Sequence, residues 1–142
     1  MALSTILVPV DGSEGANRAI DMAAKLADGN DQLRIDVAYV VPIPDLNEEE
    51  QTKFENVLDM MKEDGRALLS DAVNRLGDEA GKAEALLLAG TNPAAEIVKL
   101  CDQRAYDLIV IGNRGLSGRK EYGGSVSYKV LHGSKTPVLI VK

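Results

Sequence analysis

The chain has 142 residues, of which 45% are hydrophobic, with one Phe and no Trp, so it predicts one domain with an aliphatic core. Its net charge is -6 and no run of Lys or Arg exceeds two residues, which argues against nucleic acid or an anionic membrane surface as the main partner. One cysteine excludes an intrachain disulfide, and a start without a basic leader or an apolar span of roughly 20 residues predicts a cytoplasmic protein without a membrane segment.

Five short apolar runs predict β-strands. The runs are continuous rather than alternating, as strands buried on both faces of a parallel sheet require. The predicted strands are Thr5–Val10, Leu33–Val41, Ala83–Ala89, Leu108–Ile111 and Pro137–Val141.

The segments between these runs predict helices. Ser13 precedes the first helix, residues 14–27, and Asp28-Gly29-Asn30 follow it. Asn47 and Glu50 form a capping-box pattern for a long helix that ends near Gly77, although Gly65 interrupts it at a cost of about 1 kcal/mol. Asn92-Pro93 begins the next helix, and residues 125–132 form the last one.

The alternation of strands and helices predicts an α/β fold, a doubly wound five-stranded parallel sheet that forms a single domain over residues 1–142. Pro42 and Pro44 force an extended path in the segment 42–47, which we expect to be a surface loop.

A glycine-rich loop follows the fourth predicted strand. Residues 112–124 contain five glycines, and Ser125 and Ser127 follow in the next helix. Glycine lets backbone amides approach an anion, and a helix N-terminus adds free N–H groups and a positive dipole end, so the segment is typical of a phosphate site. The alternative is that the glycines only make turns and that Ser125 only caps a helix.

The whole chain resembles the universal stress protein family, from Ile6-Leu7-Val8-Pro9-Val10-Asp11-Gly12-Ser13 to Thr136-Pro137-Val138-Leu139-Ile140-Val141. ATP-binding members of that family carry Gly, two residues, Gly, nine residues and then Gly-Ser/Thr. Gly112, Gly115, Gly124 and Ser125 match this motif, but only eight residues separate Gly115 from Gly124.

The resemblance implies a set of nucleotide-binding residues. Asp11 lies by the ribose or adenine with Pro9 and Val10 beside it, and Val40 offers backbone groups to the adenine edge. The ribose and α-phosphate side is lined by Gly112, Arg114 and Gly115, and the β- and γ-phosphates by Gly124, Ser125, Val126 and Ser127; Ile111 also belongs to the nucleotide-binding set. From the residues alone, Asp11 is as readily a turn residue that bonds the Ser13 amide, and Val40 a core residue.

The expected function is therefore that of a stress-response module that binds ATP, or AMP or ADP, with Mg²⁺, where it accompanies the nucleotide, held mainly by the phosphates. The alternatives are a regulatory dimer of the same family without nucleotide, and a slow ATPase. The resemblance also implies a homodimer through the strand 137–141, which is apolar throughout and is expected at a sheet edge.

No catalytic residue and no metal-ligating residue is predicted. His132 is the only histidine and is expected to be exposed near a helix end, Cys101 is expected to be a packed small side chain, and Tyr39 and Tyr122 are expected to border the pocket. The sequence contains no Walker lysine motif, no His/Cys cluster and no Ser-His-Asp set.

Overall fold

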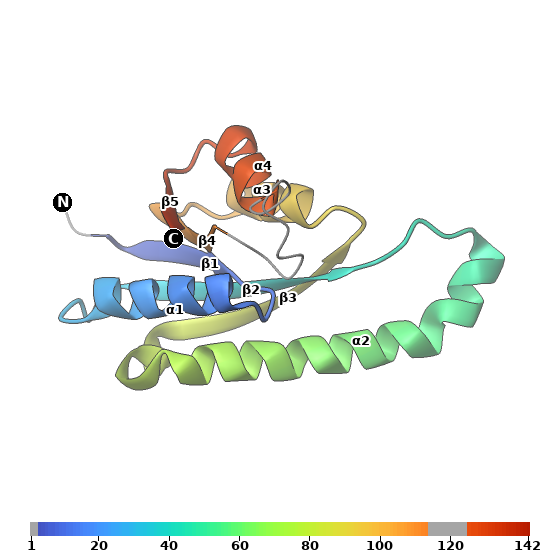
Figure 1. The fold of residues 1–142 in the computed structure, drawn as a ribbon, viewed down its shortest axis with the longest axis horizontal. Helices are drawn as coiled ribbons and strands as arrows, with labels where there is room; N and C mark the ends of the chain where they lie inside the picture. Colours follow the sequence, from blue (N-terminus) through green and yellow to red (C-terminus); the bar gives the residue numbers. More distant parts are fainter. Residues whose placement is uncertain (1–2, 114–124) are drawn as a thin grey trace.

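The computed structural model describes residues 3–113 and 125–142. Within them the chain forms one five-stranded parallel sheet of order β3-β2-β1-β4-β5 (Figure 1). The strands are β1 Thr5–Pro9, β2 Arg34–Pro42, β3 Ala83–Gly90, β4 Leu108–Gly112 and β5 Val138–Val141. The helices are α1 Glu14–Ala27, α2 Glu48–Arg75, the 3₁₀ segment η1 Gly77–Lys82, α3 Pro93–Gln103 and α4 Ser125–Gly133. The doubly wound α/β prediction is confirmed, with strand bounds that differ by one residue.

Two helical layers cover the two faces of the sheet, α1 and α2 on one face and α3 and α4 on the other (Figure 1). Alternate strand residues point to opposite faces. In β1, Ile6 and Val8 pack in the core under α1 and α2, whereas Leu7 packs in the core under α3. The continuous aliphatic runs of β1, β2 and β4 are explained by burial on both faces.

The two edge strands depart from this pattern. No residue of β3 or β5 is fully buried, and Glu84, Ala85 and Ala89 of β3 are exposed. The prediction that all five runs are buried on both faces is therefore wrong for these strands. An edge strand has a neighbour on one side only, and the helical layers do not cover it completely.

Helix capping agrees with the sequence. The Ser13 Oγ accepts a hydrogen bond from the Ala16 N–H (3.1 Å), the Asn47 Oδ1 from the Glu50 N–H (2.8 Å) and the Asn92 Oδ1 from the Ala95 N–H (3.2 Å). Gly77, with a φ of 62°, lies two residues after the end of α2 and is the first residue of η1, a segment that the sequence did not predict.

Helix α2 runs without a break through Gly65. A Cβ at Gly65 would lie 2.8 Å from the Leu87 side chain of β3 and 3.0 Å from the Tyr39 ring of β2. Glycine thus lets the helix lie close to the sheet, which offsets its low helix propensity. Although α2 has 28 residues, no described helix is both long and apolar enough to cross a membrane.

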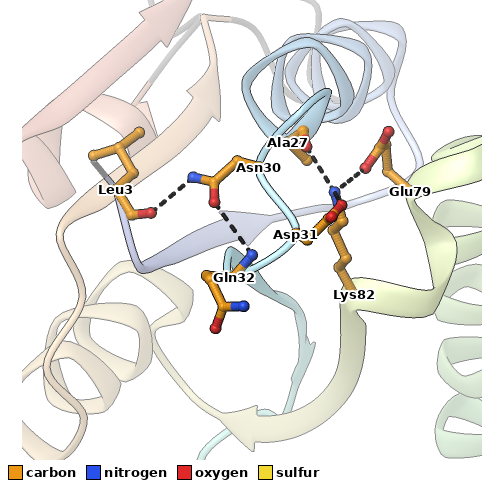
Figure 2. Close-up of polar contacts among 7 residues, drawn as sticks. All are labelled: Leu3, Ala27, Asn30, Asp31, Gln32, Glu79 and Lys82. Carbon is orange, nitrogen blue, oxygen red and sulfur yellow. Dashed lines mark hydrogen bonds and ion pairs between the residues drawn. The ribbon is translucent and has the colours of Figure 1, made fainter.

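Polar contacts tie the elements together at the amino ends of the strands (Figure 2). The Lys82 Nζ donates to the carbonyl of Ala27, at the end of α1 (2.7 Å), and lies 2.6 Å from the Glu79 Oε2. The Asn30 side chain donates to the Leu3 carbonyl (3.0 Å). These contacts hold the elements together at the amino ends of the strands. The ligand site is expected at the opposite, carboxyl ends.

Candidate functional site

The strand order changes direction between β1 and β4, and we call the region beyond the carboxyl ends of these two strands the crevice. The chain winds from β1 through β2 to β3 on one side and then crosses back to β4 on the other side of β1. After β1 the chain enters α1 on one face, and α4, which follows β4, lies on the opposite face (Figure 1). In open parallel sheets, ligands bind outside the carboxyl ends of the strands at such a switch point.

The pairing of β1 and β4 stops before the strands end. It covers Ile6↔Leu108 and Leu7↔Ile109. Strand β1 continues to Pro9 and β4 to Gly112 beyond the last pair. The facing backbone edges at the carboxyl ends are therefore not joined by ladder pairing.

Val40 directs its backbone groups toward this crevice. Pairing of β1 with β2 ends at Pro9↔Ala38, and the Val10 N–H donates to the Ala38 carbonyl (2.8 Å). Alternate residues of a strand direct their backbone groups to the same side. The N–H and carbonyl of Val40 therefore point to the β1 side, beyond the end of β1. Its side chain is buried in the core under α3, so the prediction that Val40 is a core residue is confirmed.

Asp11 makes the turn that joins β1 to α1. Its Oδ1 accepts a hydrogen bond from the Ser13 N–H (2.9 Å), as the alternative reading of the sequence predicted. Gly12 has a φ of 82°, which favours glycine, and a Cβ there would lie 3.1 Å from the Leu68 side chain of α2. Asp11 is half-buried at the mouth of the crevice, and the turn fixes its position.

Tyr39 lies on the α2 side of the sheet. Burial raises the pKa of its hydroxyl, and the negative charges of Asp11 and Asp64 raise it further. That Tyr39 borders the nucleotide pocket stays a prediction.

Gly112 has a packing role that the sequence did not reveal. A Cβ at Gly112 would lie 2.5 Å from the backbone carbon and oxygen of Gly15 and 3.0 Å from the Ala16 nitrogen. The end of β4 and the first turn of α1 thus approach each other through glycine. Gly15 and Gly112 are 97 positions apart in the sequence, so no local sequence pattern predicts their contact.

The N-terminus of α4 contains the last group of predicted site residues. The helix begins at Ser125, Val126 is exposed, and Ser127 is buried. A helix N-terminus presents free N–H groups to an anion. Of the other predicted residues, Ile111 is buried at the end of β4, whereas Arg114, Gly115, Tyr122, Gly124 and the eight-residue spacing lie outside the described residues.

His132 and Cys101 lie as the sequence predicts. His132 is exposed, and its ring lies 4.3 Å from the Tyr128 ring between centroids. Cys101 is half-buried, and burial is the main cause that raises the pKa of its thiol. In residues 3–113 and 125–142, no group of three or more His, Cys, Asp or Glu side chains is arranged to hold a metal ion.

A cavity lies between α1 and α2. It has a volume of about 460 Å³, and Val10 and Gly12 are among the residues that line it. Asp64, Leu68 and Arg75 of α2 also line it. The sequence did not predict this cavity because the register of α2 on the sheet depends on the close approach at Gly65.

The comparison with known proteins identifies the family. The model of the universal stress protein family matches residues 3–142. The chain belongs to this family. It is 32% identical to the universal stress protein YxiE of Bacillus subtilis, over 96% of this chain and 97% of that protein. It is 35% identical to a universal stress protein of Mycobacterium tuberculosis, over 99% of this chain and 97% of that protein.

Solved structures of the family share the fold. The universal stress protein UspA of Lactobacillus plantarum has a TM-score of 0.88 at 23% identity, covering 100% of this chain and 99% of that one. A universal stress protein in complex with cAMP has a TM-score of 0.75 at 30% identity, covering 100% and 99%. That of Archaeoglobus fulgidus in complex with dAMP has a TM-score of 0.69 at 26% identity, covering 100% of both chains.

Proposed function

We propose that this universal stress protein binds ATP or a related adenine nucleotide in the crevice between β1 and β4 and acts as a nucleotide-responsive stress-response module. The observation that carries the proposal is the strand order β3-β2-β1-β4-β5, with β1–β4 pairing that stops at Leu7↔Ile109. In doubly wound proteins with such a topology, nucleotides bind outside the carboxyl ends of the strands at the point where the strand order changes direction.

The described residues fit the parts of such a ligand. The backbone N–H and carbonyl of Val40 suit the hydrogen-bonding edge of adenine, and Asp11 beside Pro9 and Val10 suits a ribose hydroxyl. Ile111 and Gly112 border the ribose side. The amides at the start of α4, with Ser125, Val126 and Ser127, suit phosphate oxygens, and we extend this phosphate cradle to Arg114, Gly115 and Gly124.

The relatives support the same ligand class. Two family structures that are at least 26% identical to this chain carry cAMP and dAMP, and both ligands contain adenine. Neither carries a triphosphate. ATP itself and an accompanying Mg²⁺ are therefore the finer part of the proposal, and they rest on the Gly112, Gly115, Gly124 and Ser125 pattern.

Titration calorimetry with ATP tests the proposal. The native protein should bind one ATP per chain, and Gly124→Val combined with Ser125→Ala should weaken binding by at least about tenfold because phosphate donors are lost or blocked. Gly81→Val is a matched control, because Gly81 has no heavy atom within 4 Å of an added Cβ and lies in η1, at the amino end of β3. Equal ATP affinity of the native protein and the double variant would refute the phosphate assignment.

We further propose that the protein is a cytoplasmic homodimer in which the β5 strands of two copies pair. β5 lies at an edge of the sheet and consists of Val138-Leu139-Ile140-Val141, without a charge or a proline. Leu139→Lys and Ile140→Lys place a charge on opposite faces of the strand, and at least one should shift the mass measured by light scattering from dimer to monomer. A native protein that is monomeric at tens of micromolar would refute the dimer.

A further inference from the structure

Helix α2 is longer than the sheet on which it packs. Its 28 residues span about 42 Å, whereas the eight residues of β3 span about 26 Å. The three buried residues of α2 itself, Gly65, Leu69 and Ala72, all lie in its second half. The first half extends past the carboxyl ends of β2 and β3, and nothing is drawn against it in Figure 1.

The apolar stripe of α2 nevertheless continues into this first half. Phe54, Leu58 and Met61 are three or four residues apart and in phase with the buried Gly65, Leu69 and Ala72. All three are half-buried, and Phe54 is the only phenylalanine in the chain. Beside them, Val57 is 47% exposed and Met60 is 68% exposed. We call these five residues the α2 patch.

The charge around the α2 patch distinguishes between two classes of partner. Residues 48–64 contain seven acidic and two basic side chains, and one of the basic ones, Lys53, lies 3.4 Å from Glu49. A two-fold contact between copies would bring this acidic surface against itself, because a two-fold axis puts the same surface on both partners. Like charges at an interface are unfavourable, so the charge disfavours a second copy and favours a cationic partner.

We propose that the α2 patch is a docking surface for a cationic amphipathic helix of another protein. An apolar stripe on the partner would cover Phe54, Val57 and Leu58, and Lys or Arg beside that stripe would meet Glu55 and Asp59. Met60 and Met61 add unbranched, polarizable side chains that adapt to different apolar partners. The recognition is that of an amphipathic helix laid on an apolar surface. It is independent of the nucleotide proposed for the crevice.

Fluorescence anisotropy with labelled model peptides tests the docking surface. The probe is a peptide of about 18 residues built from Leu and Lys with its leucines on one helical face, a length sufficient for a helix on a surface. One control peptide has the same composition with leucines around the whole helix, and another replaces Lys with Glu. We expect saturable binding of the first peptide, and binding of the two controls at least about tenfold weaker.

Matched protein variants locate the binding. Val57→Ser with Met60→Ser should weaken the peptide by at least about fivefold, and Glu55→Gln with Asp59→Asn should do so at low salt. Tyr128→Ser with Leu131→Ser removes exposed apolar groups from α4, and Asp28→Asn with Asp78→Asn removes charges far from the patch; both should bind as the native protein does. Circular dichroism verifies each fold.

Three results would overturn the docking surface. They are no binding of the Leu/Lys peptide, equal binding of the native protein and the Val57/Met60 variant, and equal binding of the face-scrambled peptide. A lower mass of the Val57/Met60 variant in light scattering would instead assign the patch to contact between copies and also overturn the proposal.

Discussion

The contact between Gly112 and Gly15 predicts a large effect of a single methyl group. In Gly112→Ala the new Cβ would lie 2.5 Å from two backbone atoms of Gly15, a distance at which the backbone must move. Forcing an extra methyl group into a packed site costs about 1–3 kcal/mol. In a domain of this size each kcal/mol lowers the melting temperature by about 4 °C, so the variant should melt about 4–12 °C below the native protein.

Thermal unfolding followed by circular dichroism measures the effect, with Gly81→Ala as the matched control. Gly81 has no heavy atom within 4 Å of an added Cβ and no positive φ, so its substitution should change the free energy of unfolding by less than about 0.5 kcal/mol. If Gly112→Ala melted within 1–2 °C of Gly81→Ala, roughly the spread expected of surface substitutions, the end of β4 would not be held against α1 as described.

Two further predictions concern pH. Tyr106 is buried, and its hydroxyl donates a hydrogen bond to the Asp36 carboxylate (2.5 Å). Burial and this bond raise the pKa of the Tyr106 hydroxyl from 10.0. The stability that results is present below pH 10 and is lost as the pH rises through the higher pKa of the folded state. The advantage of the native protein over Tyr106→Phe in urea unfolding should therefore shrink between pH 8 and pH 11, roughly either side of the ordinary tyrosine value, and a constant difference would contradict this. The Asp107 Oδ2 accepts hydrogen bonds from the N–H groups of Ser4 (2.7 Å) and Thr5 (3.1 Å), which lower its pKa from 3.8. The advantage of the native protein over Asp107→Asn should be present above pH 3.8 and disappear as the pH falls through the lower value of the folded state, and an advantage that persists at the lowest pH would refute it.

Local signals in the sequence predict most of the fold. The side chains of Ser13, Asn47 and Asn92 each accept a hydrogen bond from the N–H three residues later. Each of them caps the helix that the sequence predicted. The aliphatic runs mark the strands because a buried strand needs apolar side chains on both faces. The same rule fails for β3, because its Leu86-Leu87-Leu88 run does not indicate that the strand lies at an edge.

The candidate site depends more on contacts that are distant in the sequence. The Asp11 turn is local and was predicted as an alternative, and the position of Val40 follows from its place two residues before the end of β2. The Gly15–Gly112 approach and the packing of Gly65 against Tyr39 and Leu87 are set by tertiary structure. The exposed first half of α2 could not be predicted because its residues keep the same helical period as the buried half.

Amide NMR spectra of the labelled protein titrated with ATP test the central claim most directly, because they report both binding and its place. We expect the largest shifts at Asp11, Val40 and Ser127, at the carboxyl ends of β1 and β2 and the start of α4. The amides of Asn30 and Lys82, at the opposite end of the sheet (Figure 2), should not shift. An absence of shifts at about 1 mM ATP, or shifts confined to residues away from the crevice, would contradict the proposed nucleotide site.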